Sequence, residues 1–525
     1  MPASVDVDCQ QSARDPAQPS YIFRGHTAQV HSVELLRCNT CLLTGDADGW
    51  VVCWKLDTKR PLAVWKAHNA AILATAEWGP EKVITHGRDN TLRIWQLRGG
   101  CAAYSTVLPA DGADTHRPKP WLLHTLPVNT LNFCAFTMCY QRSDAASSIT
   151  ASNETIYVAV PGRDDKKAEV YQFPEEKLIC AVPRINTSET GMVMAVKLVH
   201  HRPSNNILVI AGYEGGFTAV HRIPRNRTGV RDAVLSVAQT IYLSQPHTQP
   251  VLSIDALPDG STYFSSSADA IIAAHRIPHL PHDDVEFASP ENSVSAANNL
   301  DQNMKANINE LTEDDRTANS SGAVPGAAAI SPKSSEPVDS DTEPAEPLSF
   351  PKTRRPTNPK SPSDISKPVG RSSGLSALLA SAPPQQNLAA IPRSPPPVTI
   401  QPPHKIASTK HAGQQSLRVR SDGRLLVTGG WDSRVRVYST KTLKEVAVLK
   451  WHKEGVYAVD FGVVLGQEDV EKSVEEQKAL EEGAEVVRRE TGLAKLQRHR
   501  EEAVQMKHWV AAGAKDGRVS LWEVF

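Results

Sequence analysis

The chain has 525 residues, more than the roughly 100–200 of a typical domain, although closed all-β folds often exceed that size. Its 57 Lys and Arg almost balance its 58 Asp and Glu, so a formal net charge of −1 gives no overall basic field to attract nucleic acid or anionic lipid. Since the N-terminus is not apolar and no run of about 18 apolar residues occurs, we expect an intracellular protein without a membrane span.

The eight cysteines all precede residue 181, and most lie in apolar runs, as expected of buried thiols in a reducing compartment. Cys38 and Cys41 form one C-x-x-C pair, but no second pair follows, and a zinc site needs about four ligands. No phosphate-binding glycine motif follows a predicted strand. We therefore predict no metal, no cofactor and no small-molecule substrate.

A repeated pattern begins near the N-terminus. RGHTAQVHSV at 24–33 and KAHNAAILAT at 66–75 each place a His four residues before the apolar residue that opens a short strand. Each unit then passes through an acidic turn to a Trp, in LLTGDADGWVVCW and VITHGRDNTLRIW. The two histidines are 42 residues apart (68−26) and the two tryptophans 41 (95−54). A period of about 40–45 with this pattern is typical of WD repeats, which form four-stranded propeller blades.

Weaker copies of the unit recur along the chain. First strands are predicted to open at Val30, Ile72, Val128, Val193, Val251, Gln414 and Val456. Third strands are predicted to end at Trp54, Trp95, Tyr171, His221, His275, Tyr438 and Trp522. The sequence therefore predicts an all-β fold, a seven-bladed WD-repeat β-propeller. The chain stops after the third strand of the last unit, so we expect the segment from Tyr21 to Arg24 to supply the missing fourth strand.

Composition divides the chain further. Residues 1–20 are predicted to be a disordered N-terminus, 21–278 to form blades 1–5 with the closing strand, and 405–525 to form blades 6 and 7. Residues 279–404 are rich in Pro and Ser, a composition that favours disorder, and interrupt unit five before its fourth strand. Residues 468–507 are rich in Ala, Leu, Glu, Lys and Arg, so they predict a charged helical insertion between the first two strands of unit seven.

Polar residues of the repeats could be read as catalytic, for example a triad of His26, Thr44 and Asp48. The repeat explains them better, as a hydrogen-bond network that holds the strands of a blade together. We therefore predict no catalytic site and a structural network. Its members are His26, Thr44, Asp48, Trp54, His68, Thr85, Asp89, Trp95, Asp432, Asp516 and Trp522.

Binding residues are expected where the ring presents one face. Each unit places one side chain, directly after the residue that opens its first strand, near the mouth of the ring. These mouth residues are His31, Leu73, Asn129, Met194, Leu252, Gln415 and Tyr457. Four of them are large and apolar or aromatic, which favours protein contact over a charged groove. The alternative is that they merely line the ring.

The layout as a whole resembles the fungal ASTRA-associated protein 1 family. The resemblance is carried by the two strong N-terminal repeats, the Pro/Ser insertion before GGWDSRVRVYST, and the charged insertion before AAGAKDGRVSLWEVF. It implies a non-enzymatic scaffold in the nucleus, a subunit of the ASTRA complex that binds other protein subunits. It further implies links to chromatin remodelling and to maturation of phosphatidylinositol-3-kinase-related kinases. The alternative function is a WD-repeat substrate receptor of a ubiquitin ligase or another signalling scaffold.

Overall fold

In a computed structural model, the structure describes residues 17–97, 104–112, 116, 118–131, 133–142, 154–186, 188–224, 236–280, 398–470 and 492–524. These residues all belong to one compact unit. The predicted disorder of the N-terminus falls mostly on residues 1–16, and that of the Pro/Ser insertion mostly on 281–397, outside the described residues. In the described part, no helix is long and apolar enough to cross a membrane.

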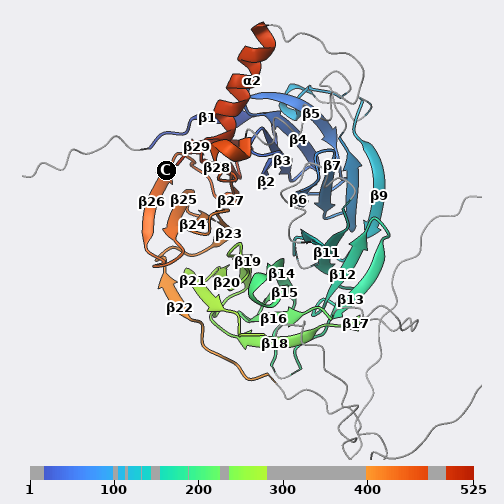
Figure 1. Ribbon diagram of the computed structural model, residues 1–525, viewed down its shortest axis with the longest axis vertical. Coiled ribbons are helices and arrows are strands. Elements are labelled where there is room, and N and C mark those ends of the chain that lie inside the picture. The colour runs from blue at the N-terminus through green and yellow to red at the C-terminus, as the bar shows by residue number, and fades with distance from the viewer. Residues whose placement is uncertain are drawn as a thin grey trace, which may run out of the picture. The chain divides into compact units, whose positions relative to one another are not determined.

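The strands form seven sheets in a ring (Figure 1), which confirms the predicted seven-bladed propeller. Blade 1 contains β2 (Val30–Leu36), β3 (Cys41–Asp46), β4 (Trp50–Lys55) and β5 (Arg60–Lys66). Blade 2 contains β6 (Ile72–Trp78), β7 (Lys82–Gly87), β8 (Thr91–Gln96) and β9 (Trp121–Pro127). Blade 3 contains β10 (Thr137–Tyr140), β11 (Ile156–Pro161), β12 (Ala168–Phe173), β13 (Lys177–Val182) and the parallel edge strand β17 (Ser236–Val237). Blade 4 contains β14 (Val193–His201), β15 (Asn206–Tyr213), β16 (Thr218–Arg222) and β18 (Gln239–Ser244).

The last three blades contain both insertions and the ring closure. Blade 5 contains β19 (Val251–Ala256), β20 (Thr262–Ser267), β21 (Ile271–Arg276) and, after the Pro/Ser insertion, β22 (Lys405–Ser408). Blade 6 contains β23 (Gln414–Val419), β24 (Leu425–Gly430), β25 (Arg434–Ser439) and β26 (Glu445–Lys450). Blade 7 contains β27 (Val456–Phe461), β28 (Trp509–Ala514), β29 (Arg518–Glu523) and β1 (Tyr21–Arg24). Short 3-10 helices occur at Pro109–Asp111 and Arg202–Ser204, and helix α2 (Gly492–Gln505) lies within the predicted helical insertion.

Closure of the ring joins the two ends of the chain. Strand β1 pairs antiparallel with β29, with Tyr21 opposite Leu521 and Arg24 opposite Arg518. The sequence predicted this pairing, because the last repeat unit lacks a fourth strand of its own. Phe23, on β1, is buried against the core of blades 7 and 1.

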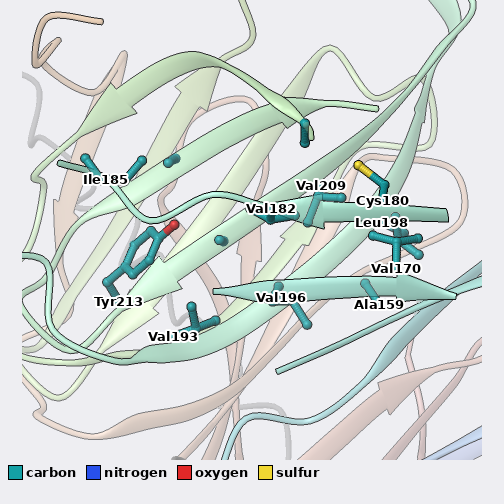
Figure 2. Packing of buried hydrophobic residues seen from close by; sticks show 14 of the residues in the cluster. Ala159, Val170, Cys180, Val182, Ile185, Val193, Val196, Leu198, Val209 and Tyr213 are labelled. Carbon is teal, nitrogen blue, oxygen red and sulfur yellow. The ribbon is translucent and has the colours of Figure 1, made fainter. Parts of the chain in front are cut away.

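The apolar core is divided among the interfaces between blades. Seven clusters of buried apolar side chains occur among the described residues, and each joins two neighbouring blades. Figure 2 shows the cluster between blades 3 and 4, where Val170 and Cys180 face Val196, Leu198 and Val209. A four-stranded sheet has two faces to cover, so each blade depends on both of its neighbours.

Buried polar side chains of blade 1 form a chain of hydrogen bonds. Trp54 Nε1 donates to Thr44 Oγ1 at 3.0 Å. Thr44 Oγ1 lies 2.7 Å from His26 Nε2, and His26 Nδ1 lies 2.7 Å from Asp46 Oδ2. Because a carboxylate can only accept, His26 Nδ1 donates to Asp46, while Thr44 Oγ1 accepts from Trp54 and lies between His26 Nε2 and Val52 O, the latter at 3.3 Å.

The prediction that Asp48 belongs to this network is wrong. Asp48 is exposed, and its backbone N–H donates to Asp46 Oδ1 at 3.0 Å. Asp46 ends β3, where its carboxylate reaches the buried His26. In blade 2 the corresponding strand end is Gly87, at which a Cβ would lie 2.2 Å from His68 Nδ1. There the turn residue Asp89 reaches His68 instead, at 2.8 Å.

In blade 2, hydrogen bonds connect all four predicted network residues. Trp95 Nε1 donates to Thr85 Oγ1 at 2.9 Å, and His68 bridges Thr85 at 2.7 Å and Asp89 at 2.8 Å. Burial opposes ionisation of Asp89, but hydrogen bonds from His68 and Thr91 hold the pKa of its carboxyl well below the usual range. A charged aspartate is therefore part of the folded blade.

Blade 5 carries a third network, which the sequence reasoning missed. His247 lies 2.8 Å from Ser265 Oγ and 3.2 Å from Asp269, while His275 takes the place of the tryptophan, 3.4 Å from Ser265. Burial lowers the pKa of His275 to about 3, so this imidazole is neutral near pH 7. Loss of the tryptophan had hidden this set of residues.

Blades 6 and 7 use altered partners. In blade 6, Asp432 pairs with the buried Arg436 at 2.5 Å. In blade 7, Trp522 Nε1 donates to Ser520 at 2.8 Å and His452 Nε2 lies 2.7 Å from the same hydroxyl. The prediction that Asp516 joins this network is wrong, because Asp516 instead accepts the N–H of Arg518 at 3.2 Å. Within the described residues, His452 Nδ1 is buried without a hydrogen-bond partner.

Carboxylates also connect the innermost strands of neighbouring blades. Asp460, on β27, accepts the N–H of Leu35 at 2.7 Å, and Asp255, the fifth residue of β19, likewise accepts the N–H of Val419 at 2.7 Å. Burial raises the pKa of Asp460 to about 6. Burial acts the same way on Asp255, but the nearby positive charges of Lys197, 2.7 Å away, and of Arg418 hold its pKa below the usual value.

A third acid adds to the charge beside Asp460. The pKa of Glu34 is raised well above its usual value by burial and by the negative charges of Asp460 and Glu77. Among the described residues, Glu34 Oε2 is buried without a hydrogen-bond partner. The pKa of Asp460 is therefore raised and that of Asp255 lowered, so ionisation of these two carboxyls should change the stability of the fold in opposite directions.

Our first prediction separates the two aspartates of blade 1. Asp46→Ala should lower the free energy of unfolding by about 1–3 kcal/mol, because it leaves His26 and two turn N–H groups without an acceptor. Asp48→Ala should change it by less than about 0.5 kcal/mol. Urea unfolding of both variants checks this. An equal loss in Asp48→Ala would contradict the assignment.

Our second prediction concerns pH. A carboxyl with a raised pKa in the folded state contributes stability below its unfolded pKa, near 4, and loses it as pH rises through about 6. Asp460→Asn keeps an acceptor for Leu35 but cannot ionise. Its free energy of unfolding, relative to that of the wild type, should therefore increase by about 1–3 kcal/mol as the pH is raised from 4 to 7.

Asp255→Asn is the matched control for this experiment. Its pKa is lowered, so the ionised form stabilises the fold above pH 4, and the variant should be less stable than the wild type at pH 7. Melting temperatures at pH 4, 5, 6 and 7 test both variants. Parallel curves for wild type and Asp460→Asn would refute the raised pKa.

Candidate protein-binding site

Six innermost strands share a β-bulge near their first residue. At each bulge one residue has no partner in the register of the adjacent strand, and a bulge of this kind re-aims the side chain of that residue. The bulged residues are His31, Leu73, Met194, Leu252, Gln415 and Tyr457. All six were predicted mouth residues, and all are partly exposed. Figure 1 shows their strands, β2, β6, β14, β19, β23 and β27, around the centre of the ring.

The seventh predicted residue, Asn129, lies in a different setting. The prediction that the first strand of blade 3 opens at Val128 is wrong, since β10 begins at Thr137. The segment between them bonds to blade 2 instead, because Val128 N–H donates to Asn90 O and Phe136 N–H to His86 Nδ1. Asn129 itself donates to Gly162 O at 3.0 Å and accepts the N–H of Leu131 within the loop.

Side chains of blades 6, 7 and 1 form an aromatic arc at this end of the ring, defined as Trp431, Tyr457 and His31. The rings of His31 and Tyr457 stack, with centroids 5.6 Å apart and planes inclined by 9°. Trp431 is 49% exposed, and its indole N–H donates to Gln415 Oε1 at 2.9 Å. Gly413 has φ +73° and lies directly against this indole, where a Cβ would clash at 2.1 Å. The arc is therefore held in place yet open to solvent.

The imidazole of His31, one of the three side chains of the arc, has a lowered pKa. Burial lowers the pKa of His31, and the positive charge of Arg88 lowers it further, against the opposing charge of Asp46. The imidazole is consequently neutral near pH 7. A neutral imidazole stacked on a phenol presents a flat surface that a partner can bury without desolvating a full charge.

A second exposed group lies at the same end of the ring, over blades 2 and 3. Leu131 is 76% exposed and Phe133 57%, and the Arg88 guanidinium lies 3.8 Å from the centre of the Phe133 ring. The sequence reasoning missed both residues because it took this segment as a strand. It also missed Trp431, although a tryptophan at the tip of an acidic turn, in GGWDSR, was a visible signal.

This end of the ring thus combines aromatic, apolar and Arg side chains, the residue types that dominate protein interfaces. The alternative triad is not assembled for catalysis, because the Thr44 hydroxyl is buried between His26 and Trp54. In the described part of the chain, no group of three or more His, Cys, Asp or Glu could hold a metal ion.

Comparisons with known proteins agree with this architecture. Residues 19–320 match the family model described as ASTRA-associated protein 1, and residues 404–439 match that of the WD domain, G-beta repeat. The ASTRA-associated protein 1 of Pyricularia oryzae is 38% identical over 97% of this chain and 98% of its own length. That of Aspergillus niger is 34% identical over 99% and 100%, and that of Schizosaccharomyces pombe 25% identical over 84% and 93%. The chain therefore belongs to the ASTRA-associated protein 1 family.

Proposed function

We propose that this protein is a non-enzymatic scaffold of the ASTRA complex that binds other protein subunits through the mouth end of its propeller. The observation that carries the proposal is the set of six bulged residues together with the aromatic arc. Relatives across nearly the whole chain are named for their association with ASTRA, which supports the choice of assembly. The polar residues of the repeats that the structure describes serve the fold, which supports a binding role over a catalytic one.

The finer parts of the proposal concern location and process. We place the protein in the nucleus, in an assembly that serves chromatin remodelling and the maturation of phosphatidylinositol-3-kinase-related kinases. These parts are supported by membership of the family. The near-zero net charge separately favours protein partners over direct contact with nucleic acid or membrane.

The energetics of the site indicate which residues dominate binding. Large aromatic side chains at the centre of an interface contribute about 2 kcal/mol or more each, whereas charges at the rim contribute little. Tyr457 and Trp431 are already held in place by His31, Gln415 and Gly413, so their side chains lose little conformational freedom on binding.

Our third prediction tests the mouth end. The triple substitution Tyr457→Ala, Leu73→Ala and Met194→Ala should weaken co-purification of nuclear partners by at least about tenfold while leaving the melting temperature within a few degrees of wild type. The measurement is quantitative mass spectrometry of the affinity-tagged full chain from its own nuclei. Arg424→Ala, at an exposed position on another turn, is the matched control and should retain all partners.

The outcome also distinguishes the alternative function. Recovery of ASTRA subunits with the wild type and their loss with the triple variant support the proposal. Recovery of ubiquitin-ligase subunits in their place would favour a substrate receptor. Retention of every partner by the triple variant would remove the mouth end from the binding site.

A further inference from the structure

Helix α2 is fixed to the ring at its C-terminal end by one buried side chain. Asn39, in the turn after β2, donates to Val463 O at 2.7 Å and to Gln505 O at 2.9 Å, and accepts the N–H of Val463 at 2.9 Å. Val463 follows β27 and Gln505 ends α2, so this one amide joins the segment before the helical insertion to the end of α2. Asn39 is 1% exposed, and its amide is satisfied at both the oxygen and the nitrogen.

Further contacts orient the same end of the helix. Glu501 pairs with Lys55 of blade 1, and the Val504 carbonyl accepts the indole N–H of Trp509 at 2.8 Å. Val504 packs against the apolar cluster between blades 7 and 1. The last turns of α2 are therefore set rigidly on two blades, and Figure 1 shows the helix projecting from the rim of the ring.

The first half of α2 has a different character. Leu493 is 79% exposed and Leu496 48%, and at this i, i+3 spacing they lie on one face. Residues 492–500 contain Lys495, Arg498, His499 and Arg500 and no acidic residue. The acids Glu501 and Glu502 begin only where the anchored half starts. Because both side chains are largely exposed, they contribute little to holding the helix on the ring.

We propose that the first half of α2 is a second docking site, which inserts into an apolar groove of a partner protein bordered by Asp and Glu side chains. The leucine face supplies the buried anchor, as in other helix-in-groove complexes. The cationic side chains of this half, Lys495, Arg498 and Arg500, are complementary to carboxylates, which selects a partner protein with an acidic rim. Anchoring by Asn39 means that the helix is ordered before the partner arrives, which lowers the entropic cost of binding.

This site is separate from the mouth end. His31 is the second residue of β2 and Asn39 follows the end of that strand, while Tyr457 and Val463 bracket β27 in the same way. A strand of six or seven residues spans about 20 Å, so the two sites lie at opposite ends of the innermost strands. The inference goes beyond the proposed function and does not depend on it.

Our fourth prediction uses a photocrosslink. In the full chain, expressed in its own cells, Leu493 is replaced by p-benzoylphenylalanine, and the crosslinked peptide is identified by mass spectrometry. We expect it to come from another protein, with apolar residues flanked by Asp or Glu. Leu496→Lys should reduce the yield by about tenfold, because the variant lacks a leucine that the partner's groove would bury. Gln497→Lys, which adds the same charge beside it on another face, should leave the yield unchanged.

The salt concentration and the mouth-end triple variant provide two further tests. Raising NaCl from 0.1 to 0.5 M should reduce the crosslink, because charge pairs at an exposed rim are screened. The mouth-end triple variant should keep it, so failure of the mouth site and failure of the helix site are distinguishable. Crosslinks only within this chain, to a second copy of it, to nucleic acid or to lipid would overturn the inference, as would equal yields from Leu496→Lys and Gln497→Lys.

Discussion

The ring exists because a four-stranded blade cannot cover both of its own faces. Each apolar cluster of the described structure lies between two blades, so removing any one blade would expose the faces of two others. Closure therefore matters more than the quality of any single repeat. Pairing of β1 with β29 provides it, since the strand that begins the fold completes the blade that ends it. This explains how weak repeats in blades 3 and 4 are tolerated.

The buried histidine networks of blades 1, 2, 5 and 7 share similar chemistry, but their members occupy different positions. In blades 1, 2 and 5 a buried imidazole meets both a hydroxyl and a carboxylate, and different backbone positions supply them. Blade 1 uses Asp46 at the strand end, whereas blade 2 uses Asp89 in the turn because Gly87 leaves room there. Blade 7 takes its hydroxyl from Ser520 on the third strand, opposite Ala512 on the second. The tertiary neighbourhood selects among these solutions.

The same strands position both proposed binding sites. A bulge at the start of an innermost strand releases one side chain toward the mouth end, and the turn that follows β2 fixes α2 at the other end. A scaffold built this way can hold two partners without a moving part, because each site is anchored to the rigid interior of the ring. The arc and the helix differ in chemistry, one aromatic and neutral, the other apolar and basic. They are therefore suited to different partners.

The sequence by itself determined the blade count, the closing strand, the placement of both insertions and the end of the innermost strands at which the six bulged residues lie. These follow from local periodicity and turn chemistry, which neighbouring residues in the chain encode. Only the tertiary structure decided that Asp46 rather than Asp48 meets His26, that β10 begins at Thr137, and that Trp431, Leu131 and Phe133 are exposed at the mouth end. Each of these depends on contacts between residues far apart in the chain or between blades, and strand periodicity carries no information about which of two nearby carboxylates reaches a buried imidazole.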